Sequence, residues 1–129
     1  MSYVDGFVIA VAEDRKQAFI DHARTADAVF IEMGALRVVE AWEDDVPDGK
    51  RTDFRRAVAL EPGERVVFSW IEWPDKATRD AAMARMMDPA HVDPRLAGPM
   101  PFDGTRMVFG GFTPVVALQG RSEKAVAGS

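Results

Sequence analysis

The sequence predicts an α+β fold, an antiparallel sheet that carries two helices on one of its faces. Strand-like runs and helical periods alternate along the 129 residues in the order β-α-β and then β-α-β again. The run RVVFSWIEW at 65–73 is the longest apolar and aromatic stretch, and a Pro-Asp pair closes it, so it is predicted to be a central strand. Two helices can cover only one face of such a sheet.

Both faces of the 65–73 strand are largely apolar. Side chains alternate between the two sides of a strand. One face carries Val66, Phe68, Trp70 and Glu72. The other face carries Val67, Ser69, Ile71 and Trp73. A sheet built around this strand is therefore expected to need a cover on both sides.

The N-terminal half is predicted to form a strand, a helix and a second strand. Residues 3–11 are mostly apolar on both alternating faces, which is typical of a buried strand. Residues 15–33 carry apolar side chains at helical spacing, with Asp14 in front as the expected N-cap and Gly34 behind as the expected stop. Residues 36–42 alternate again and give the second strand.

The C-terminal half repeats this order. Asp75 is the expected N-cap of a second helix, which should end near Asp88 because the proline that follows disfavours helical backbone before it. Residues 106–112 form the last predicted strand, in which the Gly-Gly pair at 110–111 indicates a bulge or a close backbone approach.

Two stretches have a less regular pattern. Residues 43–53 are dense in Asp, Pro and Gly and are expected to form a loop, whereas residues 54–60 fit either a short strand or a helical turn. Residues 88–105 are also rich in Pro, Asp and Gly and show no clear period. The sequence leaves the conformation of 43–64 and 88–105 open.

Two split β-α-β halves form a ferredoxin-like βαββαβ sandwich, an antiparallel sheet with both helices on one face. The length suits one hydrophobic core, so residues 1–118 are expected to form a single domain. Residues 119–129 are small and polar and are expected to fray as a C-terminal tail.

The second face of that sheet is predicted to be covered by a second copy of the chain. The uncovered face would carry either Phe68 and Trp70, or Val67, Ile71 and Trp73. Burying one large aromatic side chain removes about 150–250 Å² from water, which is worth about 4–6 kcal/mol at about 25 cal/mol per Å². Leaving such a face in water would be costly, so a homodimer is expected.

The composition excludes several classes of protein. The chain has no cysteine, which excludes disulfides and thiolate-ligated metals. Its net charge of −5 does not favour a non-specific nucleic-acid binder, whose affinity rests on Lys and Arg. No run approaches the roughly 18 apolar residues of a membrane span, and the N-terminal MSYVDGFVIAV has no basic leader, so we expect a cytoplasmic protein.

Several blocks of the sequence resemble one bacterial family. They are YVDGFV at 3–8, GALRVVEAW at 34–42, DDVPDGK at 44–50, TDF at 52–54, VVFSWIEWP at 66–74, MMDP at 86–89, and MPFDG, RM and FGGF between 100 and 112. These blocks are similar to the YbaA-like family, domain of unknown function 1428. The resemblance implies a dimeric α+β-barrel fold, and it implies no established activity, cofactor or catalytic residue.

His22 lies beside the apolar stripe of the first predicted helix. A neutral imidazole that faces the sheet could act as a general base or ligate haem. The favoured alternative is a histidine at the edge of the core, since no second His or carboxylate stands at a defined spacing to orient it. We therefore expect no cofactor.

Glu40 and Trp42 share a face of the second predicted strand, as Trp70 and Glu72 do on the third. Because those strands are antiparallel neighbours in a ferredoxin-like sheet, two carboxylates and two indoles are predicted to line one pocket. Paired acids in an apolar wall raise one pKa and form an acid/base couple. The alternative is that each Glu is solvated or paired with an arginine. The catalytic candidates are His22, Glu40 and Glu72, and the predicted ligand-binding residues are Trp42, Trp70 and Arg37.

The sequence lacks the motifs of several common sites. The acidic loop at 43–53 lacks the spacing of a calcium loop, and no metal is expected there. No glycine-rich nucleotide fingerprint is present, and the 65–73 strand lacks the aromatic pattern of RNA-recognition domains. We expect a homodimeric small-molecule-binding domain, and whether it is also a cofactor-independent acid/base enzyme stays open. A non-catalytic dimeric interaction module is the alternative, and RNA binding is the least favoured.

Overall fold

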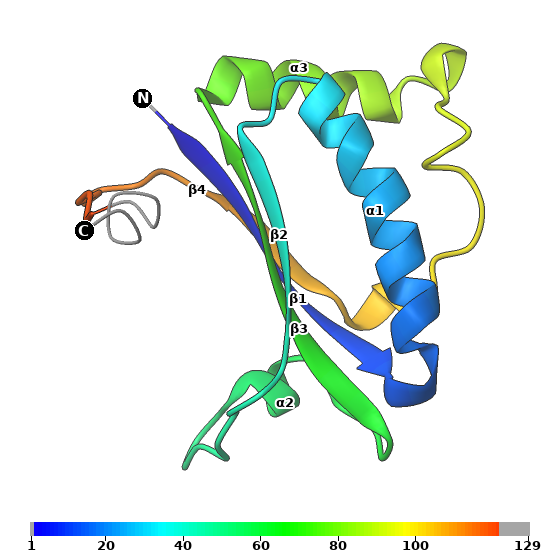
Figure 1. The fold of residues 1–129 in the computed structure, drawn as a ribbon, viewed down its shortest axis with the longest axis vertical. Coiled ribbons are helices and arrows are strands. Elements are labelled where there is room, and N and C mark those ends of the chain that lie inside the picture. The colour runs from blue at the N-terminus through cyan, green and yellow to red at the C-terminus, as the bar shows by residue number, and fades with distance from the viewer. Residues whose placement is uncertain (1, 122–129) are drawn as a thin grey trace.

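The structure is a computed structural model and describes residues 2–121 (Figure 1). Its strands are β1 (Tyr3–Ala12), β2 (Arg37–Trp42), β3 (Glu64–Trp73) and β4 (Val108–Phe112). Its helices are α1 (Lys16–Glu32), α2 (Phe54–Ala57) and α3 (Lys76–Met87). Short 3₁₀ turns lie at Glu13–Arg15, Pro89–His91 and Gly104–Arg106. Of the tail predicted to fray, residues 119–121 carry no helix or strand, and 122–129 lie outside the described residues.

The four strands form one antiparallel sheet in the order β2-β3-β1-β4. This order, with α1 and α3 together on one face of the sheet, confirms the predicted ferredoxin-like fold (Figure 1). The 65–73 run lies in an inner strand, as predicted, and its inner neighbour is β1. The edge strands are β2 and β4, so the side chains of β2 lie at the margin of the sheet.

The helix ends follow the predicted signals at α3 but not at the start of α1. The Asp75 carboxylate accepts a hydrogen bond from the Thr78 backbone N–H at 2.7 Å and caps α3. Gly34 stops the first helix with a positive φ of 112°. Asp14 was expected to cap α1, and this is wrong: it lies inside the 3₁₀ turn at Glu13–Arg15, and α1 begins at Lys16 without a side-chain cap.

The undecided stretch 54–60 forms the short helix α2. Asp53 caps it by accepting a hydrogen bond from the Arg56 backbone N–H at 2.8 Å. The last strand begins at Val108 rather than at Arg106, because Arg106 belongs to a 3₁₀ turn and pairs with Glu64 at 2.7 Å.

The Gly-Gly pair of β4 marks a close approach and not a bulge. Strand β4 pairs with β1 residue by residue, from Val4 opposite Phe112 to Val8 opposite Val108. A Cβ atom built on Gly111 would lie 2.2 Å from the Tyr3 hydroxyl oxygen, so a larger residue would collide there. The atom that approaches Gly111 belongs to the Tyr3 side chain, whereas the sequence predicted the approach of a backbone.

The main core lies between the sheet and the two long helices. Its buried side chains include Ile9, Val11, Phe19, Val29, Val67, Ile71 and Trp73. Asp5 is buried within this layer, where its carboxylate accepts a hydrogen bond from the Trp73 indole N–H at 2.9 Å. The Arg79 guanidinium of α3 donates to the same carboxylate at 2.9 Å and ties the helix to the sheet.

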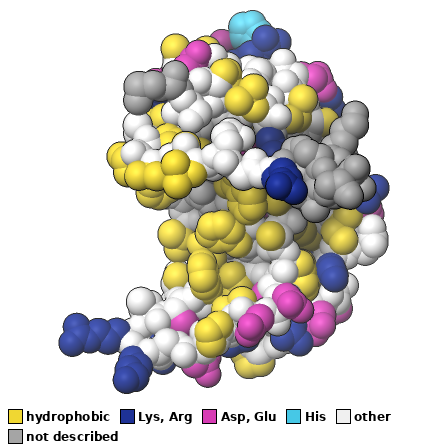
Figure 2. All heavy atoms as spheres, turned by 60° about the vertical axis from the view of Figure 1, so that its left-hand side comes forward, with side chains coloured by type: hydrophobic (Ala, Val, Ile, Leu, Met, Phe, Trp, Pro, Cys, Tyr) yellow, Lys and Arg dark blue, Asp and Glu magenta, His cyan; other side chains and the backbone are white. Residues whose placement is uncertain are grey.

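The opposite face of the sheet, which we call the open face, is the Phe68 and Trp70 face. Helix α2 covers only one end of it, where Val58 packs against Ala10 and Val66. The side chains of Phe68 and Phe112 are 45% and 61% exposed. Figure 2 shows that this side is hollowed and that hydrophobic side chains gather in the hollow. The other predicted alternative, exposure of Ile71 and its neighbours, is wrong because they are buried under the helices.

Candidate functional site

The register of β2 against β3 separates the two acidic and aromatic pairs predicted to share a pocket. Glu40 lies opposite Ser69, and Trp42 lies opposite Val67. Since residues directly opposite each other share a face, Glu40 and Trp42 point toward the helices. Trp70 and Glu72 occupy the alternate positions of β3 and belong to the open face. The prediction of one pocket with all four residues is therefore wrong.

A cavity of about 380 Å³ lies between α1 and the edge strand β2. We call it the α1–β2 cavity. Its helical residues recur at intervals of three and four and so share one side of α1. The lining consists of Lys16, Phe19, Ile20, Ala23, Arg24, Asp27, Glu40 and Trp42. Apolar walls thus surround two carboxyl groups, with two cations among the exposed lining residues.

The Glu40 carboxyl is the group in this cavity with the most unusual environment. Burial raises the pKa of Glu40 to about 8, and the negative charge of Asp27 adds to the rise. The neighbouring Ser69 hydroxyl acts in the opposite direction and lowers the pKa. Within residues 2–121, Glu40 Oε2 is the one buried side-chain polar atom without a hydrogen-bond partner.

Asp27 completes a pair of carboxyl groups with Glu40. Burial raises the pKa of Asp27, whereas the neighbouring Glu40 carboxyl and the charge of His22 lower it. Two carboxylates offer only acceptors to each other, which explains why Glu40 Oε2 lacks a donor. One proton held between the two groups would supply the missing donor and remove one negative charge. Such a pair would present a neutral acid beside a charged base.

Aromatic side chains form the wall of the cavity at the Trp42 end. The Phe19 and Trp42 rings lie 6.4 Å apart between centroids, and Phe102 lies 6.0 Å beyond Phe19. The Lys16 ammonium lies 5.0 Å from the centre of the Trp42 ring, within the range of a cation–π contact. Trp42 is thus the predicted ligand-binding residue that does line a cavity with Glu40.

The two histidines have different surroundings. His22 is half-buried on α1, its ring meets the edge of Phe102 at 6.4 Å, and its charge affects the pKa of Asp27. It is therefore close enough to influence the carboxyl pair, although it does not line the α1–β2 cavity. His91 is exposed and its Nδ1 lies 2.7 Å from the Asp88 carboxylate.

Three of the predicted site residues gather on the open face instead. The Trp70 indole N–H donates a hydrogen bond to Glu72 at 2.9 Å. Arg37 Nε lies 4.0 Å from the same Glu72 carboxylate, and the two side chains are 64% and 36% exposed. This contact agrees with the alternative prediction, in which Glu72 pairs with an arginine. The Trp70 ring also lies 5.7 Å from Phe68, which meets Phe54 at 5.8 Å.

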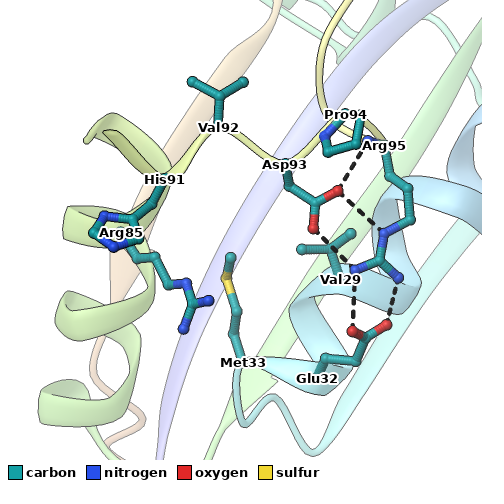
Figure 3. A pocket seen from close by; sticks show the side chains of 9 residues that line it. All are labelled: Val29, Glu32, Met33, Arg85, His91, Val92, Asp93, Pro94 and Arg95. Carbon is teal, nitrogen blue, oxygen red and sulfur yellow. Dashed lines mark hydrogen bonds and ion pairs between the residues drawn. The ribbon is translucent and has the colours of Figure 1, made fainter. Parts of the chain in front are cut away.

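A second cavity, of about 410 Å³, lies where α1 and α3 end and the loop after α3 returns. Figure 3 shows Arg95 pointing at two acids in this cavity, Glu32 and Asp93. Its guanidinium donates to Glu32 at 3.0 Å and to Asp93 at 2.9 Å. Because these charges satisfy one another, we interpret the contacts as a clamp that holds the loop against α1. No group of three or more His, Asp or Glu side chains suited to a metal ion occurs within the described part of the chain.

Three charged residues of the lining were not predicted as site residues: Lys16, Arg24 and Asp27. The signal for Asp27 was its place four residues after Ala23, beside the apolar stripe of α1, where a carboxylate faces the sheet margin. Lys16 and Arg24 carried no such signal, because exposed cations are common on any helix.

Comparisons with known proteins give a family and a fold. The family described as "Protein of unknown function (DUF1428)" matches residues 2–104. The Escherichia coli K12 protein named "Uncharacterized protein YbaA" is 55% identical over 119 residues, which cover 90% of this chain and 98% of that protein. The protein of the same name from Shigella flexneri is equally similar.

One solved structure has a similar fold. It is a dimeric ferredoxin-like protein from an uncultured marine organism, with a TM-score of 0.50 and 15% sequence identity. The match covers 93% of this chain and 100% of that protein. At this identity the likeness shows the fold alone. Within residues 2–121, none of the helices combines the length and hydropathy that a membrane-spanning helix requires.

Proposed function

The chain belongs to the DUF1428 family of proteins of unknown function, and we propose that it is a homodimeric small-molecule-binding domain whose α1–β2 cavity performs acid/base chemistry. The observation that carries this proposal is the Asp27 and Glu40 pair, two carboxyl groups in one largely apolar cavity with a buried oxygen that lacks a donor. Burying such groups costs stability unless they are paired, so a role in binding is a physical reason for their presence.

The chemistry open to this pair is the transfer of one proton to a ligand and of another from it. Glu40, neutral near pH 7, donates its proton to an oxygen or nitrogen of the ligand. Asp27, as the carboxylate, accepts a proton from a neighbouring atom of the same ligand. The two steps leave the enzyme with the same number of protons, so this exchange needs no cofactor.

The open face supports the homodimer. Phe68 and Phe112 lie exposed on it, and α2 leaves most of the face uncovered. A second copy that packs sheet to sheet would remove this apolar surface from water. The ferredoxin-like protein of similar fold is described as dimeric, which is consistent with this arrangement.

A thermal-shift screen with a library of small carbonyl compounds, phenols and carboxylic acids tests the binding function. We expect compounds that raise the unfolding temperature of the wild type but not that of Glu40→Gln or Asp27→Asn. Glu72→Gln is the matched control, since Glu72 is a carboxylate on the open face and should leave the shift unchanged. Compounds that stabilise all four proteins equally would show that the carboxyl pair is not part of the binding site.

A non-catalytic dimeric interaction module is the second candidate function. It is favoured by the aromatic row of Phe54, Phe68 and Trp70, which places much of the exposed apolar surface on the open face rather than in the cavity. A screen without any stabilising compound, together with a dimer in solution, would favour this candidate. RNA binding is not favoured, because the Glu72 carboxylate beside Trp70 would repel phosphates.

A further inference from the structure

The charged groups of the α1–β2 cavity are unevenly distributed. Asp27 and Glu40 are partly buried, whereas Lys16 and Arg24 are exposed. Within residues 2–121 neither cation forms an ion pair; Lys16 lies against the Trp42 ring. If the acid pair holds one proton, as the proposed function requires, the two cations and the one carboxylate give the lining a net charge of +1. The cavity is therefore electrostatically suited to an anion.

The distance between Trp42 and Glu40 along β2 sets the length of a ligand that could contact both Lys16 and Glu40. Lys16 is held over Trp42, and Glu40 lies two residues away on the same face of the strand. Two residues of a strand span about 7 Å. The walls between these points are apolar or aromatic, namely Phe19, Ile20, Ala23 and Trp42. An anionic group at Lys16 and a polar group at Glu40 would thus be joined by a flat apolar body.

We propose that the α1–β2 cavity binds a carboxylic acid with an apolar, planar body and a second polar group about 7 Å from its carboxylate. Lys16, held over Trp42, binds the carboxylate at the rim, and the acid pair binds the second polar group. This inference rests on the proposed function of the same cavity and adds the class of ligand. Exposed ion pairs contribute modestly, so the contact with Lys16 should improve affinity by about three-fold.

Isothermal titration calorimetry of the full chain at pH 7 and low salt tests the inference with one series of probes. The probes are 4-acetylbenzoate, its neutral analogue 4-acetylbenzamide, the cationic 4-acetylbenzylamine, and benzoate, which lacks the second polar group. We expect 4-acetylbenzoate to bind about three-fold more tightly than the amide, the amine to bind most weakly, and benzoate to bind less tightly than 4-acetylbenzoate.

Substitutions of the rim cations identify the contact. Lys16→Met should weaken 4-acetylbenzoate about three-fold and leave 4-acetylbenzamide unchanged, whereas Arg24→Met, about two turns further along α1, should change the affinity for 4-acetylbenzoate less. Lys50→Met and Arg51→Met, which remove one charge each from the loop after β2, are the matched controls and should change neither affinity. All four side chains belong to exposed residues, so the variants should fold.

The results separate this inference from the function on which it rests. If the amide or the amine binds as tightly as the acid and loses its affinity in Glu40→Gln, the ligand class is wrong while the cavity function stands. The same holds if Lys16→Met binds 4-acetylbenzoate like the wild type. If no probe of the series binds, the ligand class is overturned, and the thermal-shift screen with Glu40→Gln and Asp27→Asn decides the cavity function separately.

Discussion

At the residue scale, Glu40 should make the stability of the fold depend on pH. Its pKa is raised from an ordinary value of about 4.5 to about 8, so the folded state holds its proton over a range where the unfolded chain has released it. The folded state then binds more protons than the unfolded state, and the free energy of unfolding falls as pH rises from about 4.5 to about 8. Burial of the Asp27 carboxyl acts in the same direction.

Glu40→Gln should remove the part of this pH dependence that Glu40 causes. We expect the variant to match the wild type near pH 5 and to be more stable by about 2 kcal/mol near pH 9, because Gln carries no charge to bury. Urea unfolding at both pH values measures the difference. Glu72→Gln, which alters the exposed pair of Arg37 and Glu72, should differ from the wild type by the same free energy of unfolding at pH 5 and at pH 9. A wild type that gains stability relative to Glu40→Gln with rising pH would contradict the assignment.

Asp5 should be the most sensitive polar residue of the core. Its buried carboxylate accepts hydrogen bonds from Trp73 and from Arg79, and Asp5→Asn leaves the Arg79 charge without its partner. We expect a loss of about 3 kcal/mol in the free energy of unfolding, measured with urea at pH 7. Asp80→Asn is the control, since Asp80 pairs with Lys76 and Arg79 at the surface and should cost less than about 1 kcal/mol. Equal losses in the two variants would contradict this account.

Side-chain chemistry was visible in the sequence, whereas side-chain partners were not. Glu40 and Trp42 were identified because alternation along a strand is a local property. That Glu40 meets Asp27 depends on how α1 rotates and slides over β2, which no local pattern specifies. The role of Asp5 was not predicted for the same reason, because its partners Trp73 and Arg79 lie far along the chain.

At the element scale, the two aspartates proposed as helix caps should behave differently. Asp75→Ala should destabilise the protein by about 1 kcal/mol, because the Asp75 carboxylate caps the Thr78 N–H at the start of α3. Asp14→Ala should have an effect near zero, since Asp14 lies in a 3₁₀ turn and caps no helix. Thermal and urea unfolding compare the two variants directly. A larger loss for Asp14→Ala would reverse the assignment of the caps.

The elements were predicted better than their mutual register. Gly34 and Asp75 mark helix ends through their own conformational preferences, so their positions could be read from the sequence. Whether residue 40 lies opposite residue 69 or 70 decides which face it shares, and a shift of one residue reverses the answer. This dependence on register explains why the residues of the predicted pocket are divided between a cavity under α1 and a contact on the open face.

At the scale of the whole molecule, the open face should determine the oligomeric state. We expect size-exclusion chromatography with light scattering to give twice the chain mass of 14.2 kDa at micromolar concentration. Phe68→Lys should give a folded monomer, because it places a charge in the middle of the face that a second copy would bury.

Phe109→Lys is the matched control for the dimer. Phe109 is 68% exposed but lies opposite Phe7, on the helix side of the sheet at its edge. This variant should remain a dimer. A monomeric wild type, or monomers from both variants, would show that the open face is not the specific contact.

Carbon-13 NMR titration of the glutamate side-chain carboxyls tests whether Asp27 and Glu40 share one proton in the α1–β2 cavity. We expect one glutamate, Glu40, whose carboxyl titrates with a pKa of about 8. In Asp27→Asn its midpoint should move downward, because the neighbouring negative charge is gone. A Glu40 carboxyl that titrates near 4.5 in the wild type would contradict the account.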